Sequence, residues 1–322
     1  MKILSVDDDP EFLDFIKLEL SALGCTNVVQ ASSAEQAQKL VKAAKDPFDL
    51  FLLDIDMPEI DGVQLCSMLR REPTAASVPI VMVTVRAELE SVDRAFEAGA
   101  TDYLSKPLSR RELRGRVQMA ERLALERATL KHASSNGGAT VVTNVGDPIL
   151  LEGVPGCIDY LAMQNYMLKL NSIQAFTHVA QGVCVTNVDD IFLTKDSMSF
   201  RDAILDVAEI LSESLGSGTR LISYLGSGEF VFLVNRVSGW DQDAFMDVLT
   251  IKLSDLGNLY KTAGEIIPRL RLGEPTVRKL FSMLTPDELL VQAIENARDE
   301  GTDLVFRPDF DTPENGEVRE AV

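Results

Sequence analysis

The chain has 322 residues, of which 46% are hydrophobic and 25% are charged, and its net charge at pH 7 is −19. This length is typical of two domains, and this apolar fraction is sufficient for a sizeable buried core. So negative a field repels nucleic acid phosphates and anionic lipid, and no apolar run reaches the ~18 residues of a membrane span, so we expect neither nucleic acid binding nor membrane insertion.

The first third of the chain alternates short apolar runs with amphipathic stretches. The apolar runs predict strands at 2–6, 28–29, 49–54, 79–84 and 102–104, and the amphipathic stretches predict helices at 10–23, 34–44, after Gly62, at 89–98 and from 109. Strands that alternate with helices form a parallel sheet through right-handed crossovers. The predicted fold class is therefore α/β, a doubly wound sheet of five parallel strands covered on both faces.

Polar residues follow four of these strands. Asp7 and Asp8 follow the first strand, Asp54 ends the third, Thr84 ends the fourth and Lys106 follows the fifth. These strand ends lie at one edge of the sheet, where open α/β sheets bind ligands. Three converging carboxylates repel one another, so we expect a cation between them, and all-oxygen ligation favours Mg²⁺. Lys106 would neutralise an anionic product, and Thr84 would donate a hydrogen bond to it.

Four sequence blocks in this region carry a family resemblance. They are Val6–Pro10, Leu53–Pro58 with Asp61-Gly62, Val83-Thr84 and Ala98–Pro107. In this order they resemble the receiver domain of two-component response regulators, over about residues 1–125. The resemblance implies a flavodoxin-like domain that takes a phosphoryl group from a sensor histidine kinase or a phosphotransfer protein.

The resemblance also implies a role for each acid at the sheet edge. Asp54 would be the phosphorylation site. Mg²⁺ would be held by Asp8, Asp54 and the carbonyl of Asp56, while Asp7 would act on the ion through water. Phosphoryl transfer of this kind needs positioning and charge neutralisation, with little covalent assistance from the protein.

Three further residues take roles by the same resemblance. Thr84 and Lys106 would bind the phosphoryl oxygens, and Tyr103 would be the aromatic switch that turns inward when Thr84 moves. The acyl phosphate would then bias a two-state equilibrium of loops and helix faces.

Two features depart from the family pattern. Val85 follows Thr84 where the family usually has Ala or Gly, and its bulk would restrict access of water or of the phosphoryl donor. Arg86 and Asp56 flank the phosphorylation site. An ion pair between them would cover the site and slow hydrolysis; the alternative is that both are solvated surface residues.

Residues 109 to about 130 are rich in Ala, Leu, Glu and Arg and carry an apolar stripe of helical spacing. A helix of ~22 residues is roughly 33 Å long, more than a receiver needs to cover its sheet. We expect its first half to pack on the receiver and its second half to project, where it could pair with a second copy in a homodimer. Residues 126–157 would be this helical extension and a flexible linker.

Residues 158–308 predict an α+β domain with a mixed or antiparallel sheet. Strands are expected at 182–188, 221–225, 229–234, 267–273 and 304–306, and helices at 157–170, 200–215, 245–259 and 287–298. A glycine-rich turn at 226–228 joins two of the strands as a hairpin. The acidic residues 309–322 are expected to be a disordered tail.

Three blocks of this second domain resemble the GGDEF domain of diguanylate cyclases: Asn187–Ile191, Tyr224–Val231 and Ala293–Gly301. The signature itself reads Gly226, Ser227, Gly228, Glu229, Phe230. The carboxylate of its third position is therefore absent, and the first metal position is the neutral Asn187. The resemblance implies a nucleotidyl cyclase-type fold that is degenerate and has lost cyclase activity.

These observations predict a response regulator of a two-component phosphorelay that signals through its degenerate output domain, by protein–protein contact or dimerisation. Its downstream protein partner is not specified by the sequence. One alternative is a divergent diguanylate cyclase that makes cyclic di-GMP from GTP. Others are a nucleotide sensor without turnover, and a receiver that is the whole functional unit beside an inert second domain.

The cysteines give the expected compartment. Cys25, Cys66, Cys157 and Cys184 are scattered, without CxxC or metal-type spacing. The first residues run at once into three Asp, which is unlike a secretory leader. We expect reduced, buried thiols in a cytoplasmic protein.

Overall fold

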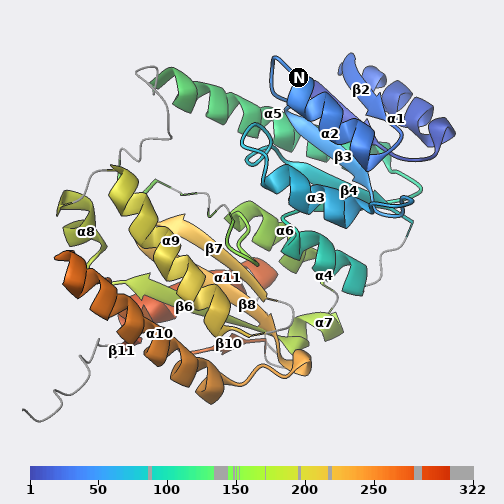
Figure 1. The fold of residues 1–322 in the computed structure, drawn as a ribbon. Coiled ribbons are helices and arrows are strands. Elements are labelled where there is room, and N and C mark those ends of the chain that lie inside the picture. The colour runs from blue at the N-terminus through green and yellow to red at the C-terminus, as the bar shows by residue number, and fades with distance from the viewer. Residues whose placement is uncertain are drawn as a thin grey trace, which may run out of the picture.

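The structure is a computed structural model that describes residues 1–85, 89–133, 144–147, 149, 151, 153–170, 172–194, 197–216, 220–278 and 285–304. Within these ranges the chain forms two domains, each built on one sheet (Figure 1). Arg86, residues 134–143 of the predicted extension and linker at 126–157, and the predicted tail at 309–322 lie outside the described residues.

The first sheet contains five parallel strands in the order β2-β1-β3-β4-β5. They are β1 Lys2–Val6, β2 Asn27–Ala31, β3 Leu50–Asp54, β4 Ile80–Thr84 and β5 Asp102–Ser105. Every residue of β3 and β4 is buried, because helices cover both faces of the sheet. The predicted five-stranded, doubly wound parallel sheet is confirmed.

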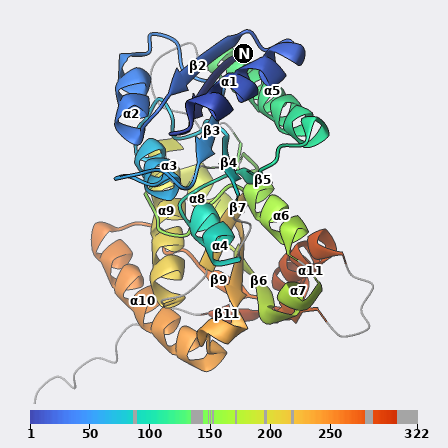
Figure 2. The same ribbon diagram turned by 90° about the vertical axis from the view of Figure 1, so that its right-hand side faces the viewer.

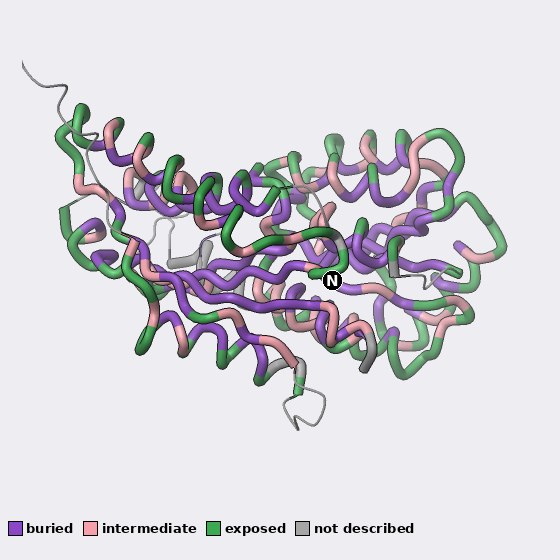
Figure 3. Tube along the Cα trace, turned by 90° about the horizontal axis from the view of Figure 1, so that it is seen from below, coloured by how far each residue is buried: buried purple, intermediate pink, exposed green. Residues whose placement is uncertain are grey.

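Helices cover this sheet on both sides. On one face, α1 Pro10–Ala22 and α5 Arg110–Ala133 share a hydrophobic cluster with the strands. On the other face, α2 Ala34–Ala43 and α3 Gly62–Arg70 share a second cluster, to which α4 Leu89–Glu97 contributes Ala95. Figure 3 shows the strands of both domains as long buried stretches between helices with exposed outer faces.

Helix α5 is longer than the first sheet requires. It has 24 residues, which corresponds to roughly 36 Å. Leu113, Val117 and Ala120 in its first half are buried against the sheet. Figure 1 shows its far end continuing beyond the sheet, as expected for a connector.

The second sheet is antiparallel. Its order is β11-β9-β6-β8-β7, and β10 pairs with β6. The strands are β6 His178–Val185, β7 Arg220–Gly226, β8 Glu229–Asn235, β9 Leu270–Leu272, β10 Thr276–Val277 and β11 Thr302–Leu304. The expectation of an α+β domain with an antiparallel sheet is confirmed.

The connections of this sheet follow a β-α-β-β-α-β course through β6, α9 Ser197–Ser214, β7, β8, α10 Gln242–Ala263 and β9, which is a ferredoxin-like arrangement. Helices α9 and α10 share one hydrophobic cluster with the sheet. Helices α6 Tyr160–Lys169 and α11 Pro286–Asp299 share another with its opposite face.

The elements next to β6 differ from their predicted positions. The strand begins at His178 and ends at Val185, after a short helix α7 Ser172–Thr177 that the sequence did not indicate. Residues Val188–Thr194 form helix α8 instead of continuing the strand. The turn is held by Asn187, whose carbonyl accepts from the Ile191 amide and whose side chain bonds the chain leading into β9.

The two domains also share a core. Val92 and Phe96 of α4 belong to the hydrophobic cluster formed by α6, α11 and the second sheet. Both views of the ribbon show α4 next to α6 (Figures 1 and 2). The face of the first domain that carries α4 is therefore covered by the second domain of the same chain.

Candidate functional site

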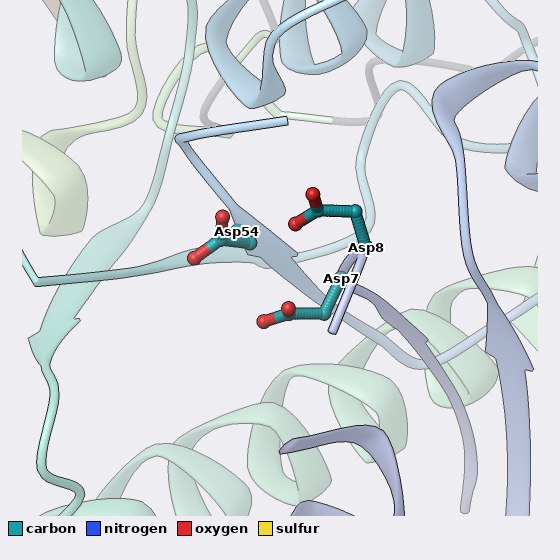
Figure 4. Close-up of side chains that lie close together, drawn as sticks. All are labelled: Asp7, Asp8 and Asp54. Atoms are coloured by element: carbon teal, nitrogen blue, oxygen red, sulfur yellow. The ribbon is translucent and has the colours of Figure 1, made fainter. Parts of the chain in front are cut away.

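Three acids meet at the carboxyl edge of the first sheet. Asp7 and Asp8 follow β1, and Asp54 is the last residue of β3, which pairs in parallel with β1 through Val6 and Leu53. One carboxylate oxygen from each acid lies within 4.8 Å of the others. Figure 4 shows the three side chains reaching into the same space from adjacent strand ends. The sequence prediction placed these three residues together, and the structure does so.

Lys106 completes the charge balance of this site. Its Nζ lies 2.7 Å from Asp7 Oδ2 and 2.7 Å from Asp54 Oδ1. Its backbone amide donates to the Thr84 carbonyl over 2.7 Å, which ties the end of β5 to the end of β4. Thr84 is fully buried. Lys106 and Thr84 therefore lie beside Asp54, as predicted.

Phe12 is a site residue that sequence reasoning missed. The Lys106 Nζ lies 3.9 Å from the centre of the Phe12 ring, so the ammonium sits between two carboxylates and an aromatic face. The sequence shows Phe12 only as one apolar position of helix α1. Nothing in that pattern indicates a contact with a lysine 94 positions further along the chain.

Burial and charge set the protonation of the pair. Burial raises the pKa of the Asp54 carboxyl, the hydrogen bond with Lys106 opposes that rise, and the Asp7 carboxylate adds to it. Burial acts to lower the pKa of Lys106, but its bonds to Asp54 and Asp7 outweigh burial and raise that pKa. The Lys106 ammonium offsets only one of the three carboxylate charges, so the site favours further positive charge.

The donor set fits a hard divalent cation. Three carboxylates supply only oxygen ligands, and Asp8 is exposed while Asp7 and Asp54 are buried, so one side stays open to water. Mg²⁺ binds in this way, through a few carboxylates and several waters. Among the described residues this is the one cluster of three or more acids, Cys or His with such spacing.

A glycine keeps the backbone close behind Asp54. A Cβ on Gly62 would lie 1.9 Å from the Asp54 carbonyl oxygen, and the Gly62 amide donates to the Ile55 carbonyl over 3.0 Å. Asp61 caps helix α3 in a capping box with Gln64. The Asp61-Gly62 pair of the sequence thus starts α3 directly against the end of β3.

The residues that flank the site are placed as follows. The Asp56 side chain is exposed and is not one of the three clustered carboxylates, so only its backbone carbonyl stays a candidate ligand. Val85 is 66% exposed, next to the buried Thr84. The predicted ion pair of Asp56 with Arg86 involves a residue outside the described ranges.

Tyr103 lies between the two domains. It is half-buried and packs against hydrophobic clusters of both. The Nζ of Lys169, on α6, is 4.7 Å from its ring centre and 4.0 Å from the neighbouring Asp102. The predicted switch residue therefore contacts the second domain directly, through a lysine that no sequence motif indicates.

The glycine-rich hairpin of the second domain is closed. The Ser227 amide donates over 2.7 Å to the carbonyl of Val145, and a Cβ on Gly226 would lie 2.2 Å from the Gly146 carbonyl oxygen. Residues 144–147, which precede the second domain in the chain, thus lie on the turn. A Cβ on Gly228 would lie 2.9 Å from both the Val185 carbonyl oxygen and Val188 Cβ.

Two polar residues of the blocks that carry the second resemblance, Glu229 and Asn187, are held by protein groups. Both carboxylate oxygens of Glu229 accept from the Arg298 guanidinium, one of them over 2.6 Å. The Asn187 side chain donates to Ile267 and accepts from the Arg269 amide. Neither side chain is poised as a metal ligand.

Comparisons with known proteins agree with the first site. Residues 3–118 match the family model of the response regulator receiver domain. The chain is 34% identical over 117 residues to the DNA-binding dual master transcriptional regulator RpaA of Synechocystis, and 37% identical over 117 residues to the alkaline phosphatase synthesis transcriptional regulatory protein PhoP of Bacillus subtilis. Each match covers 36% of this chain and 47% of the relative, so the chain spans about half the length of these relatives.

One solved structure is similar to part of this chain. A putative response regulator from Chloroflexus aurantiacus is 36% identical, with 38% of this chain and 97% of that chain covered and a TM-score of 0.35. By its family match and the curated relatives, the N-terminal part of this chain is a response regulator receiver domain. Receiver domains interact with sensor histidine kinases or phosphotransfer proteins and bind Mg²⁺ at their acidic pocket.

No described helix has both the length and the apolarity needed to cross a membrane.

Proposed function

We propose that this protein is a phosphorylation-controlled regulator whose second domain signals without catalysis. Asp54 accepts a phosphoryl group from the phosphohistidine of a sensor kinase or a phosphotransfer protein. An oxygen of the Asp54 carboxylate bonds to phosphorus while the phosphorus–nitrogen bond to the histidine breaks. Asp8, Asp54 and the Asp56 carbonyl would hold Mg²⁺, and Asp7 would act on the ion through water. The bound ion would supply positive charge against the charge that builds up on the phosphoryl oxygens.

Lys106 and Thr84 respond to the new group. Lys106 exchanges its bond with Asp54 for one with a phosphoryl oxygen, and Thr84 donates to another oxygen. Tyr103 and α4 follow, because both lie next to β4. These two elements are in contact with the second domain, so the change of state is passed on as a change of domain docking.

We assign the second domain a GGDEF-like but non-catalytic role. The ferredoxin-like strand order and the hairpin at 226–228 support the resemblance. The observation that carries the loss of catalysis is the closed hairpin, since residues 144–147 occupy its turn and Arg298 neutralises Glu229. A nucleotide would have to displace a bonded segment of the chain itself.

Phosphorylation is tested on the full chain with a small phosphodonor and Mg²⁺. Intact-mass measurement should find one added phosphoryl group in the wild type and none in Asp54→Asn. Asp14→Asn, which changes an exposed acid on α1, should match the wild type. Phosphoryl incorporation in Asp54→Asn would remove Asp54 as the acceptor.

The proposed non-catalytic role of the second domain is tested with the same samples. Incubation of phosphorylated protein with GTP and Mg²⁺ should yield no cyclic di-GMP, and calorimetry should detect neither GTP nor cyclic di-GMP binding. Product formation would favour the cyclase alternative, and binding without product the sensor alternative. Wild-type behaviour in cells of a chain truncated at about residue 130 would favour the receiver as the whole functional unit.

The remaining assignments concern partners. The downstream partner is a protein that recognises the second domain once docking changes. The covered α4 face argues against receiver pairing through α4 in the docked state, so we place homodimer formation after release of that face. Sedimentation with and without phosphorylation measures this directly.

A further inference from the structure

A buried contact joins the receiver to the second domain around Tyr166. This side chain, on α6, is fully buried, and its ring packs edge-on against Phe96 of α4, with 5.2 Å between the ring centres. Figure 2 shows α4 lying beside α6 where the two domains meet. Tyr166 is therefore a residue of the second domain whose buried surroundings include a receiver side chain.

A chain of hydrogen bonds runs through the Tyr166 hydroxyl. It lies 2.7 Å from Asp93 Oδ1 on α4 and 2.8 Å from His178 Nε2 on β6. His178 is fully buried, and its Nδ1 lies 2.9 Å from the Gln174 carbonyl oxygen. The chain therefore crosses from the receiver into the centre of the second sheet.

The hydrogen positions in this chain can be counted. The Gln174 carbonyl only accepts, and Thr177 already donates its hydroxyl hydrogen to it over 2.7 Å. The close Nδ1 of His178 must therefore carry a hydrogen. Its Nε2 then either accepts from Tyr166, in a neutral ring, or donates to Tyr166, in an imidazolium.

Both arrangements need the same extra proton. If the Tyr166 hydrogen points to a neutral His178, the Asp93 oxygen at 2.7 Å must be protonated to bond Tyr166. If His178 is an imidazolium, the Tyr166 hydrogen goes to an ionised Asp93. With an ionised Asp93 and a neutral His178, one hydroxyl hydrogen cannot serve both partners, so two lone pairs meet at hydrogen-bond distance.

The charged surroundings of the chain are mostly acidic on the receiver side. Burial lowers the pKa of His178, while the Gln174 carbonyl and Asp93 act to raise it. Burial and Asp93 raise the pKa of Glu97, also on α4, against the opposing effects of Arg220 on β7 and Arg94. Among the described residues, Asp93 is the charged group that acts on His178, and Asp93 and, more weakly, Glu97 act on Tyr166.

We propose that Asp93, Tyr166 and His178 form an interdomain latch that shares one proton, so that docking of the second domain on the receiver depends on pH as well as on phosphorylation. Docking takes up the proton, and docking is strongest while Asp93, Tyr166 and His178 share that proton. As pH rises and the proton leaves, the docked state loses a buried hydrogen bond and opens. The titration belongs to the three groups together and not to one residue.

The latch deepens the proposed function, and its signalling role rests on that function. Phosphorylation has to separate α4 from α6, and the latch is the polar part of that contact. The existence of the latch does not depend on phosphorylation, so it can be tested in the unphosphorylated full chain.

The first experiment observes His178 directly. The chain has two histidines, His132 and His178, so a His132→Gln background leaves one imidazole signal. Nitrogen-15 NMR of that ring should show a hydrogen on Nδ1 throughout the docked range, and a change in the ring signals as docking is lost at higher pH. A ring that carries its hydrogen on Nε2 alone would overturn the proposal.

The second experiment measures docking against pH by small-angle X-ray scattering of the full chain. Loss of one proton predicts an apparent docking constant that falls by about tenfold per pH unit across the transition. Tyr166→Phe should open the protein and remove this pH dependence. Tyr260→Phe is the control, because it removes a partly buried Tyr–Asp bond, to Asp206 over 2.6 Å, away from the interface.

Asp93→Asn separates a shared proton from simple loss of a bond. An Asn amide would donate to the Tyr166 oxygen, and Tyr166 would donate to neutral His178, so the chain is complete without an extra proton. We expect this variant to stay docked and to lose the pH dependence. An undocked Asp93→Asn, a pH dependence that survives in it, or a wild type whose docking is constant with pH would each overturn the latch.

These outcomes are distinct from a failure of the proposed function. A pH-dependent wild type that does not open on phosphorylation would keep the latch and remove its signalling role. A wild type that opens on phosphorylation, with docking constant with pH, would keep the function and remove the latch.

Discussion

Lys106 Nζ lies 2.7 Å from Asp54 Oδ1, and the same atom lies 2.7 Å from Asp7 Oδ2. One ammonium thus holds the predicted phosphorylation site and its neighbouring acid together. The pair is buried to different degrees, with 5% of the Asp54 side chain and 17% of the Lys106 side chain exposed. A phosphoryl group on Asp54 must therefore enter a site in which its counter-charge is already in position.

Removal of that ammonium should slow phosphorylation. We expect Lys106→Ala to lower the rate of phosphoryl incorporation from a small donor by about 10²-fold, since one preorganised positive donor to the developing charge is lost. Lys42→Ala, at an exposed lysine on α2, is the control and should not change the rate. An unchanged rate in Lys106→Ala would show that Lys106 does not contact the transferring group.

The backbone behind Asp54 should tolerate no side chain. Gly62→Ala places a methyl group against the Asp54 carbonyl, so we expect a loss of about 1–3 kcal/mol in the free energy of unfolding and slower phosphorylation. Gly115→Ala, in α5 with open space around its Cβ, should instead gain about 0.5–1 kcal/mol. Urea unfolding of the two variants measures both signs, and a stabilised Gly62→Ala would contradict the close approach.

The interface between the domains should depend on Phe96. This receiver side chain is fully buried in the cluster of the second domain. Phe96→Ala should therefore lower the free energy of unfolding by about 3–5 kcal/mol, measured as a lower urea concentration at the unfolding midpoint. Phe15→Ala, at a ring on α1 that is 41% exposed, should stay within about 0.5 kcal/mol of the wild type. Equal effects of the two substitutions would argue against a docked interface.

Placing an acid at Gly228, where the GGDEF signature would have one, should not give the protein cyclase activity. Gly228 has a φ of 76°, and a Cβ there would collide with Val185 and Val188. Backbone strain alone costs about 1–3 kcal/mol in the free energy of unfolding, and Gly228→Asp should lose more than that because of the collision. Gly216→Asp measures the strain without the collision, because Gly216 has φ of 71° and open space. Cyclic di-GMP synthesis by Gly228→Asp with GTP and Mg²⁺ would reverse this conclusion.

The thiols of Cys66 and Cys157 should be unreactive in the native state. Burial raises the pKa of Cys66 to about 11 and that of Cys157 to about 12. At pH 8 both groups are therefore almost entirely thiol, with roughly a thousandfold excess over thiolate at Cys66, and thiolate is the reactive form. We expect neither to label with iodoacetamide within the time that labels all four cysteines in urea. Labelling of native Cys66 would show that its site opens.

The cysteine prediction held in part. All four thiols are unpaired and Cys25 and Cys66 are buried, but Cys157 and Cys184 are only half-buried. Sequence spacing excluded a metal site without indicating which cysteines reach the surface. Burial at these positions depends on strands distant in the sequence, because Cys157 bridges to Ile222 of β7 and Cys184 pairs with Glu229 of β8.

The receiver was predictable from sequence because its signals are local. Short runs buried on both faces, the Asp61-Gly62 pair before a helix and acids at strand ends all appear within a few residues of one another. Parallel pairing then forces every such strand end to one edge of the sheet. That is why Asp7, Asp54 and Lys106 could be brought together before the structure was known.

The second domain was less predictable for a related reason. Its strand and helix types followed from periodicity, but the boundaries around β6 moved, because Asn187 bonds a segment 80 residues away and starts a helix there. The same holds for Glu229, whose role changes once Arg298, 69 positions later, takes both its oxygens. A motif shows which side chain is present and not which partner holds it.

The sequence by itself therefore determined the chemistry available to this protein. It specified a sheet edge with three carboxylates and a lysine, and a hairpin that lacks one acid. Only the tertiary structure decided what surrounds these groups. It placed the Phe12 ring against Lys106, residues 144–147 against the hairpin, and α4 against α6. Periodicity reports which face of an element is buried, while the choice of partner depends on how all elements pack at once.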